Sequence, residues 1–129
     1  MILIDTSAWV EFLRDTGSDV CQKVDDLLGD DIATCHPIRM EVLSGARDEP
    51  HLSDLRRLLA RASLLPTRAT DYEQAAALFR ACRCGGETVR KLIDCLIAAT
   101  AIRAGVAVLH ADSDFDTLAR HSQLQIEAP

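Results

Sequence analysis

The sequence lacks any apolar run long enough to cross a membrane. A transmembrane helix needs roughly 18 or more consecutive apolar residues, and no hydrophobic stretch of this chain approaches that length. The N-terminus also lacks the basic segment and longer apolar stretch of a signal peptide, because Asp5 follows the first four residues directly. We therefore expect a cytoplasmic protein that does not associate with a membrane.

Paired cysteines are absent as well. The chain has 5 cysteines, an odd number, and none of them forms a CxxC pair, so neither a disulfide framework nor a zinc knuckle is predicted. Cys82 and Cys84 form a CxC, and Cys35 adjoins His36, but the local sequence supplies no third and fourth zinc ligand. We expect reduced and partly buried thiols.

The chain has no excess of positive charge. Its 14 Lys and Arg against 20 Asp and Glu give a net charge of −6, which argues against a protein that coats nucleic acid nonspecifically. An enzyme that acts on nucleic acid is not excluded, because a bound metal would offset some of these carboxylates. With 129 residues, of which 48% are hydrophobic, the chain is predicted to form a single domain over residues 1–129.

Short apolar runs alternate with amphipathic segments along the chain. Strands are predicted at residues 1–5, 32–35, 106–109 and 124–127, with a weaker candidate at 63–66. Helices are predicted at residues 6–13, 19–28, 37–44, 51–61, 70–83, 88–104 and 113–121. Thr70 and Glu73 have the spacing of a capping box. This alternation predicts an α/β sandwich around a central, mainly parallel sheet of four to five strands.

Four carboxylates interrupt segments that otherwise have the composition of buried core. Asp5 and Asp112 each follow an apolar strand, whereas Glu41 and Asp94 lie within predicted helices, Asp94 about six residues into its own. An unpaired buried carboxylate costs roughly several kcal/mol, so four of them are expected to surround a cation. Parallel strands bind ligands beyond their carboxyl ends, and the four side chains can converge there.

Each acid alone also has a simpler interpretation. Asp5 and Asp112 are placed to cap the helix that follows. Glu41 is placed to pair with Arg39 or Arg47. These alternatives stay open for the single residues, although the set is more specific than any member.

Asp94 is the hardest of the four to explain without a metal. Arg90 lies one turn earlier, but an exposed ion pair fits poorly with the apolar neighbours of Asp94. Hard oxygen ligands without His or Cys point to Mg²⁺ or Mn²⁺. Such ions polarise phosphoryl oxygens and activate water, which makes phosphodiester cleavage the leading chemistry.

The motifs around these acids resemble those of PIN-domain proteins, and of VapC toxins in particular. The matching segments are MILIDTSAWV at 1–10, MEVLSG at 40–45, DCLIAA at 94–99 and DSDF at 112–115, in order over nearly the whole chain. The resemblance implies a PIN-like three-layer α/β/α sandwich. It also implies a Mg²⁺- or Mn²⁺-dependent endoribonuclease, the toxin of a toxin–antitoxin pair, that inhibits translation by cleaving structured RNA such as tRNA or rRNA. The implied products are a 5′-phosphate and a 3′-hydroxyl.

The resemblance assigns the catalytic quartet to Asp5, Glu41, Asp94 and Asp112. Asp5, Asp94 and Asp112 would bind the metal, with Asp5 and Asp94 its most direct ligands. Glu41 would act as a base or orient the attacking water, and the sequence does not decide between these roles.

Three accessory residues follow from the same motifs. Asp114 matches an accessory acidic position, and Thr6 matches a hydroxyl that orients a carboxylate or a metal-bound water. His110 stands where many members of the family carry Thr. Its predicted role is open between binding a phosphate, steadying a water, and lying partly exposed at a strand end.

Basic residues near the motifs are candidates for holding RNA at the edge of the acidic pocket, because phosphate contacts position a nucleic acid. They are Arg14, Arg39, Arg80, Arg83, Arg90 and Lys91. Each is equally open to being a solvated charge on a helix face.

The resemblance also implies partners, namely a VapB-like antitoxin, an RNA substrate, a second copy of the chain and a toxin–antitoxin hetero-oligomer. Trp9, Val10, Phe12 and Leu13 are candidates for docking an amphipathic antitoxin segment, or else for the core. Two other functions stay open. One is a housekeeping PIN nuclease for RNA processing without an antitoxin, which the small size disfavours. The other is a non-catalytic RNA- or protein-binding module, which the four retained acids disfavour.

Overall fold

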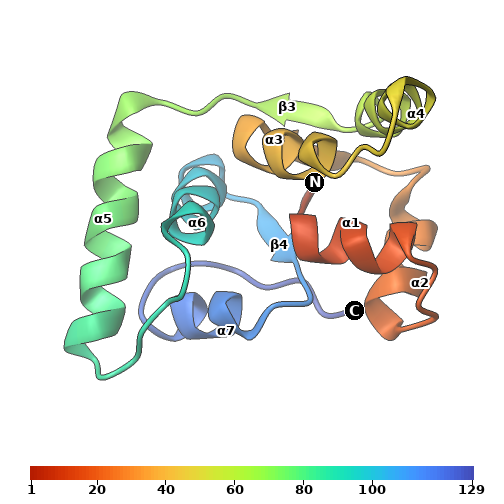
Figure 1. The fold of residues 1–129 in the computed structure, drawn as a ribbon. Helices are drawn as coiled ribbons and strands as arrows, with labels where there is room; N and C mark the ends of the chain where they lie inside the picture. Colours follow the sequence, from red (N-terminus) through yellow and green to blue (C-terminus); the bar gives the residue numbers. More distant parts are fainter.

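A parallel four-stranded sheet lies at the centre of the computed structural model, which describes all 129 residues (Figure 1). Its strands are β1 (Ile2–Ile4), β2 (Ile32–Cys35), β3 (Ser63–Leu65) and β4 (Ala107–Leu109), in the order β3-β2-β1-β4. Every neighbouring pair is parallel, so the carboxyl ends of all strands share one edge. The apolar runs therefore form the predicted parallel sheet.

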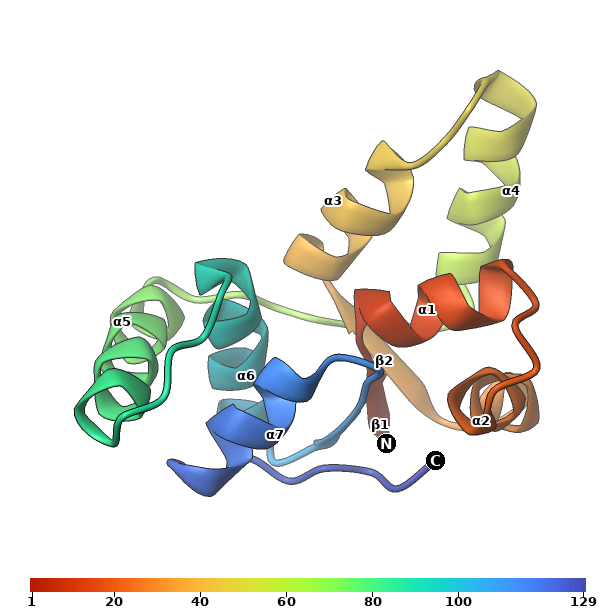
Figure 2. The same ribbon diagram turned by 60° about the horizontal axis from the view of Figure 1, so that its bottom comes forward.

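Seven helices surround the sheet, and helices and sheet together form three layers. They are α1 (Thr6–Leu13), α2 (Asp19–Leu27), α3 (His36–Ser44), α4 (Glu49–Leu59), α5 (Ala69–Cys84), α6 (Leu92–Ala104) and α7 (Ser113–Arg120). Figure 2 shows α1 and α2 on one side of the sheet and α5, α6 and α7 on the other, while α3 and α4 form a hairpin beyond the end of β2. The predicted α/β/α sandwich is confirmed. None of the helices combines the length and apolarity that spanning a bilayer requires.

The C-terminal strand predicted at residues 124–127 is reduced to one bridge. Ile126 pairs in parallel with Val108, and Val108 exchanges backbone hydrogen bonds with Gln125 and Glu127. The segment therefore adds to the edge of β4 without becoming a full strand.

The helix predicted over residues 88–104 begins four residues later, at Leu92. The preceding segment is held in another way, because Val89 is buried in the core and the backbone N–H of Arg90 donates to Asp114. As a result Asp94 is the third residue of α6, in its first turn, rather than about six residues into the helix.

The capping box predicted for Thr70 and Glu73 is wrong. Helix α5 begins one residue earlier, at Ala69, and the carboxylate of Asp71 accepts a hydrogen bond from the backbone N–H of Arg68 at 2.9 Å. Arg103 of α6 also binds Asp71, with Nε donating to Oδ1 at 2.8 Å and Nη2 donating to Oδ2 at 3.0 Å. The same guanidinium donates to the carbonyl of Pro66. We call this arrangement the Asp71 clamp.

The core includes the single tryptophan. Trp9 is fully buried and packs edge-on against Phe12, with ring centroids 6.3 Å apart. The suggestion that Trp9 docks a partner is therefore wrong, because no part of it reaches the surface. Leu13, one turn further along α1, is 44% exposed.

Candidate active site

The four predicted acids line one cavity at the carboxyl edge of the sheet. Asp5 follows β1 and Asp112 follows β4, while Glu41 comes from α3 and Asp94 from α6. The cavity measures about 270 Å³. Its lining residues are Asp5, Thr6, Ser7, Val10, Glu11, Glu41, Lys91, Asp94, Ala111 and Asp112. The structure thus brings together the quartet that the sequence predicted.

Asp5 both caps a helix and presents a free oxygen. Its Oδ2 accepts hydrogen bonds from the backbone N–H of Ser7 at 2.9 Å and from the Ser7 hydroxyl at 2.6 Å, which caps α1. Its Oδ1 is buried and has no partner. Burial raises the pKa of Asp5 despite the opposing bonds from Ser7. The two interpretations of Asp5 therefore apply to its two oxygens.

Ser7 is a site residue that the sequence analysis missed. Its hydroxyl donates to Asp5 and also accepts from the backbone N–H of Ala111 at 2.9 Å, which links the loops after β1 and β4. The spacing of Ser7 two residues after an Asp is a recognisable capping signal. The contact with Ala111 spans 104 residues and leaves no local signal.

Thr6 holds Glu41. The Thr6 hydroxyl donates to Oε1 of Glu41 at 2.8 Å, and this bond joins α1 to α3. Glu41 forms no ion pair with Arg39 or Arg47, the alternative partners considered from the sequence. Its carboxylate is instead fixed at the cavity wall by a neutral donor.

Asp94 is the least satisfied of the acids. It is 3% exposed, and its Oδ2 is buried without any hydrogen-bond partner. Burial raises the pKa of Asp94 to about 7, and the negative charges of Asp5 and Asp112 add to this effect against the opposing charge of Lys91. Asp94 does not pair with Arg90, the partner that the sequence offered.

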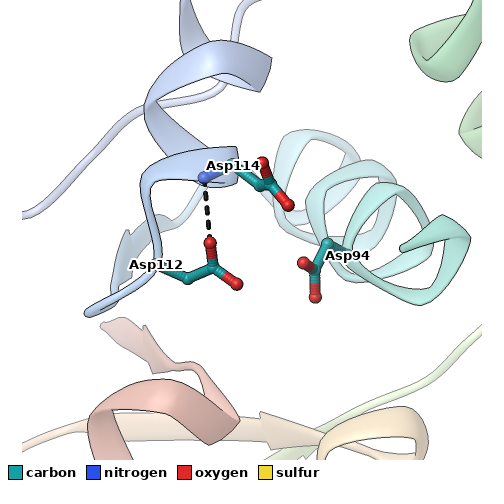
Figure 3. A group of neighbouring side chains, drawn as sticks. All are labelled: Asp94, Asp112 and Asp114. Carbon is teal, nitrogen blue, oxygen red and sulfur yellow. Dashed lines mark hydrogen bonds between the residues drawn. The ribbon is translucent and has the colours of Figure 1, made fainter. Parts of the chain in front are cut away.

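Asp112 and Asp114 complete an acidic cluster with Asp94 (Figure 3). Each of the three offers an oxygen, and these oxygens lie within 4.8 Å of one another. Oδ1 of Asp112 accepts from the backbone N–H of Asp114 at 3.0 Å and from Nη2 of Arg90 at 2.8 Å. The tightest grouping thus contains Asp114 in addition to the predicted ligands Asp94 and Asp112, while Asp5 lies on the wall of the same cavity.

His110 supports the loop that carries Asp112. Its Nδ1 accepts from the backbone N–H of Asp112 at 3.1 Å, so Nε2 carries the proton and donates to Asp116 at 3.2 Å. The ring packs against Phe115 with centroids 5.3 Å apart. Both ring nitrogens already have partners, which leaves neither free for a phosphate or a water.

The donor set fits a divalent cation. Two buried oxygens without partners, Oδ1 of Asp5 and Oδ2 of Asp94, belong to residues that line the same cavity as Asp112. A buried carboxylate oxygen without a partner is costly, and a cation of high charge density removes that cost. The ligands are all oxygens, which suits Mg²⁺ or Mn²⁺ rather than zinc.

Comparison with known proteins identifies the family. A model of the PIN domain matches residues 2–121. The VapC ribonuclease Mb1587 of Mycobacterium bovis and the ribonuclease VapC11 of Mycobacterium tuberculosis are each 51% identical to this chain over 129 residues, which covers 97% of this chain and 96% of theirs. The chain belongs to the VapC-type PIN-domain proteins.

Solved structures of lower sequence identity share the VapC-type fold. One such structure is VapBC2 from Rickettsia felis, bound to a DNA fragment from its promoter. The matching chain superposes on this one with a TM-score of 0.78, at 20% identity and with 98% of both chains covered. VapC20 of Mycobacterium tuberculosis, described as a toxin that cleaves the sarcin–ricin loop, gives a TM-score of 0.69 at 18% identity over 97% of this chain and 99% of its own. At these identities the likeness concerns the fold.

Of the six basic candidates in this VapC-type chain, only Lys91 lines the acidic cavity. Lys91 immediately precedes α6 and forms no ion pair with any acid. Arg14 lines a neighbouring groove, and Arg39 lines another cavity on α3. Arg90 is bound to Asp112 and Asp114, and the remaining two, Arg80 and Arg83, are exposed on α5. The six therefore occupy different environments.

Proposed function

We propose that this VapC-type protein is a divalent-metal-dependent endoribonuclease and the toxin of a toxin–antitoxin pair, which inhibits translation by cleaving structured RNA such as tRNA or rRNA. The observation that supports the chemistry is the pair of unpartnered buried oxygens on Asp5 and Asp94, which belong to residues lining one cavity with Asp112. The 51% identity to VapC ribonucleases favours the toxin over a housekeeping nuclease or a non-catalytic module.

Asp5, Asp94 and Asp112 would hold the metal, with Asp114 beside them. A bound Mg²⁺ or Mn²⁺ supplies Lewis acidity toward a phosphoryl oxygen and lowers the pKa of bound water. Glu41, fixed through one oxygen by Thr6, accepts the proton of the attacking water on its other oxygen. The new bond forms between the water oxygen and phosphorus as the bond from phosphorus to the 3′ oxygen breaks. The 3′ oxygen takes a proton from solvent, which gives a 5′-phosphate and a 3′-hydroxyl.

Lys91 contacts the phosphate that is cut. It lines the acidic cavity, and no carboxylate engages its ammonium group in an ion pair. A cation at this position offsets the repulsion between the phosphate and the four acids. Arg14, Arg39, Arg80 and Arg83 do not line the acidic cavity, and they would hold flanking nucleotides.

An antitoxin would bind in the groove between α1, α3 and α4. This groove measures about 390 Å³ and includes the apolar residues Val10, Leu13 and Leu55. Thr6 and Glu41 lie in its wall, so an amphipathic helix seated there reaches the acidic cavity. The fold is shared with VapC chains in VapBC complexes.

A second copy of the chain would pack on the other side of α3. There Met40 and Tyr72, each 60% exposed, border a cavity of about 710 Å³ that also includes Arg39. Such exposed apolar side chains are typical of interfaces. A cytoplasmic location suits an RNA substrate and the five unpaired cysteines.

The decisive experiment compares the Asp94→Asn variant with the wild type in RNA cleavage. Asp94→Asn should abolish cleavage and keep the fold, and a chelator should abolish cleavage by the wild type. Asp54→Asn, at an exposed carboxylate on α4, is the matched control and should cut at the wild-type rate. Full activity of Asp94→Asn, or cleavage that continues in the chelator, would contradict the proposal.

The toxin role has its own test in cells. Expression of the wild-type chain should arrest growth, and Asp94→Asn or co-expression of the product of the neighbouring gene should prevent the arrest. Sequencing of new RNA 5′ ends after brief expression would identify the substrate. Normal growth with active enzyme in the cell would favour a housekeeping nuclease.

A further inference from the structure

The side chain of Arg90 forms hydrogen bonds with two carboxylates of the candidate metal site at once. Its Nε donates to Oδ2 of Asp114 at 3.0 Å, and its Nη2 donates to Oδ1 of Asp112 at 2.8 Å. Its backbone N–H also donates to Oδ2 of Asp114, at 3.2 Å. The guanidinium is planar and rigid, so these bonds fix the two carboxylates relative to each other.

The bonds from Arg90 leave one oxygen of Asp112 free of the guanidinium. Lys91 lines the acidic cavity, whereas its neighbour Arg90 does not. The oxygen of Asp112 that binds Arg90 is the one that also accepts from the backbone of Asp114, and Figure 3 shows the other oxygen of Asp112 pointing toward Asp94. One oxygen of Asp114 also points toward Asp94 (Figure 3).

We infer that Arg90 is a positioning residue, which holds Asp112 and Asp114 in place so that one oxygen of each faces Asp94 and a bound metal. The inference rests on the proposed metal-dependent function and adds a role that differs from RNA contact. Residues behind metal ligands that orient them typically change metal affinity or activity 10- to 100-fold when they are removed, roughly. Arg90 also offsets the repulsion between two neighbouring carboxylates.

Two other roles for Arg90 predict a different change in metal affinity when the side chain is removed. If the guanidinium merely stands in for the metal, its removal relieves competition and tightens metal binding. If Arg90 holds RNA, its removal weakens RNA binding and leaves metal affinity unchanged. Positioning alone predicts that metal affinity falls although a positive charge has been taken away. The sign of the change therefore separates the three roles.

The test measures Mn²⁺ affinity by titration calorimetry on the protein without RNA, for the wild type and three variants. Arg90→Ala should bind Mn²⁺ on the order of 10- to 100-fold more weakly. Arg90→Lys should also bind more weakly, about tenfold, because an ammonium group cannot form the planar fork that reaches both carboxylates. Arg57→Ala removes an exposed charge on α4 that does not line the acidic cavity, and it should bind Mn²⁺ with the wild-type affinity.

Circular dichroism and thermal melting of each variant without metal establish that it is folded. If Arg90→Ala does not fold, the Mn²⁺ affinity of Arg90→Lys tests the inference in its place. Tighter or unchanged Mn²⁺ binding by Arg90→Ala overturns the inference, as does wild-type affinity in Arg90→Lys. Failure of the wild type itself to bind Mn²⁺ overturns the proposed function and the inference together. Weaker binding by both Arg90 variants with normal binding by Arg57→Ala supports positioning.

Discussion

Two buried carboxylates in neighbouring helices show opposite solutions to one problem. Asp71 is the third residue of α5 and Asp94 the third residue of α6, and they are 2% and 3% exposed. Asp71 receives hydrogen bonds on both oxygens from Arg103 and one from the backbone of Arg68, which holds its pKa below the usual range. Asp94 has an oxygen without any partner, and burial raises its pKa to about 7.

The difference between Asp71 and Asp94 separates stability from function. Both occupy the first turn of a helix, where the helix dipole favours a negative charge, so this position does not distinguish them. The Asp71 clamp satisfies its carboxylate within the fold, and such a group has no capacity left for a ligand. The site around Asp94 leaves the cost of burial in place, and the proposed cation would remove it. Buried carboxylate oxygens without a partner, such as those of Asp5 and Asp94, are therefore a better guide to function than buried carboxylates in general.

The largest expected effect comes from Asp94→Asn. Loss of this proposed metal ligand should lower RNA cleavage by on the order of 10³-fold, because the proposed metal would contribute several kcal/mol of transition-state stabilisation. The same change removes an unpaired buried charge, so the metal-free protein should melt at a higher temperature at about pH 7.5. Cleavage assays and thermal melting measure the two effects. A lower melting temperature would show that Asp94 supports the fold as Asp71 does.

Next in size is the loss of the clamp through Arg103→Ala. It leaves Asp71 buried and unpaired, which should lower the free energy of unfolding by about 3 kcal/mol, as measured by urea denaturation. Folded Arg103→Ala should still cleave RNA at the wild-type rate. Arg57→Ala is the matched control, because its ion pair with Asp54 is exposed and should contribute less than about 1 kcal/mol. A loss of catalysis in folded Arg103→Ala would show that the Asp71 clamp contributes to function as well as to stability.

The pH dependence of the free energy of unfolding should be set in part by the titration of Asp94. Its pKa is raised in the folded state, so the folded protein holds a proton that the unfolded chain releases, and stability falls as pH rises from about 4 toward about 7. Between about pH 5 and pH 7.5 the metal-free protein should lose about 2 kcal/mol through this group. Asp94→Asn should flatten the dependence, and Mn²⁺ should restore stability more at the higher pH. Urea denaturation at each pH measures the effect.

Asp71 should act at the opposite end of the pH range. Its pKa is lowered in the folded state, so the stability it provides is present above its unfolded pKa of about 4 and is lost only as pH falls through that region. Its contribution therefore stays constant across the window used for Asp94. A slope that persists in Asp94→Asn would assign the effect to other groups, such as Asp5.

The smallest effect is expected at Thr6. Thr6→Val keeps the shape of the side chain but removes the hydroxyl that holds Glu41, and this should slow cleavage about tenfold, the equivalent of one hydrogen bond. Mn²⁺ affinity should stay within about twofold of the wild type, since Glu41 is not proposed as a ligand. Thr6→Ser keeps the donor and is the matched control. Equal slowing in both variants would attribute the effect to packing instead of the hydrogen bond.

The sequence was informative where a local pattern carries the structure. Asp5 and Asp112 follow apolar strands, and the parallel sheet then places them at one edge. Asp94 stood out because its neighbours are apolar. Helix α6 was placed wrongly at its start, because the residues before Leu92 are held by contacts with α7 that no local periodicity records.

Contacts between distant segments account for what the sequence did not show. Arg90 reaches carboxylates 22 and 24 positions away, and Arg103 reaches Asp71 over 32 positions. Charge and spacing allow many partners for an arginine, and only the packed structure selects one. The clamp was missed for this reason, and Arg90 was grouped with basic residues in quite different surroundings.

The hydrogen bond between Ser7 and Ala111 has a consequence for the order in which the site is completed during synthesis. β1 is made before its partner β4 and before the loop at Ala111, which follows Ser7 by 104 residues. Until they arrive, Asp5 and Ser7 lack the neighbours that shape the cavity, and Asp112 does not yet exist. The site that brings the four acids together is therefore incomplete until the segment after β4 has been made.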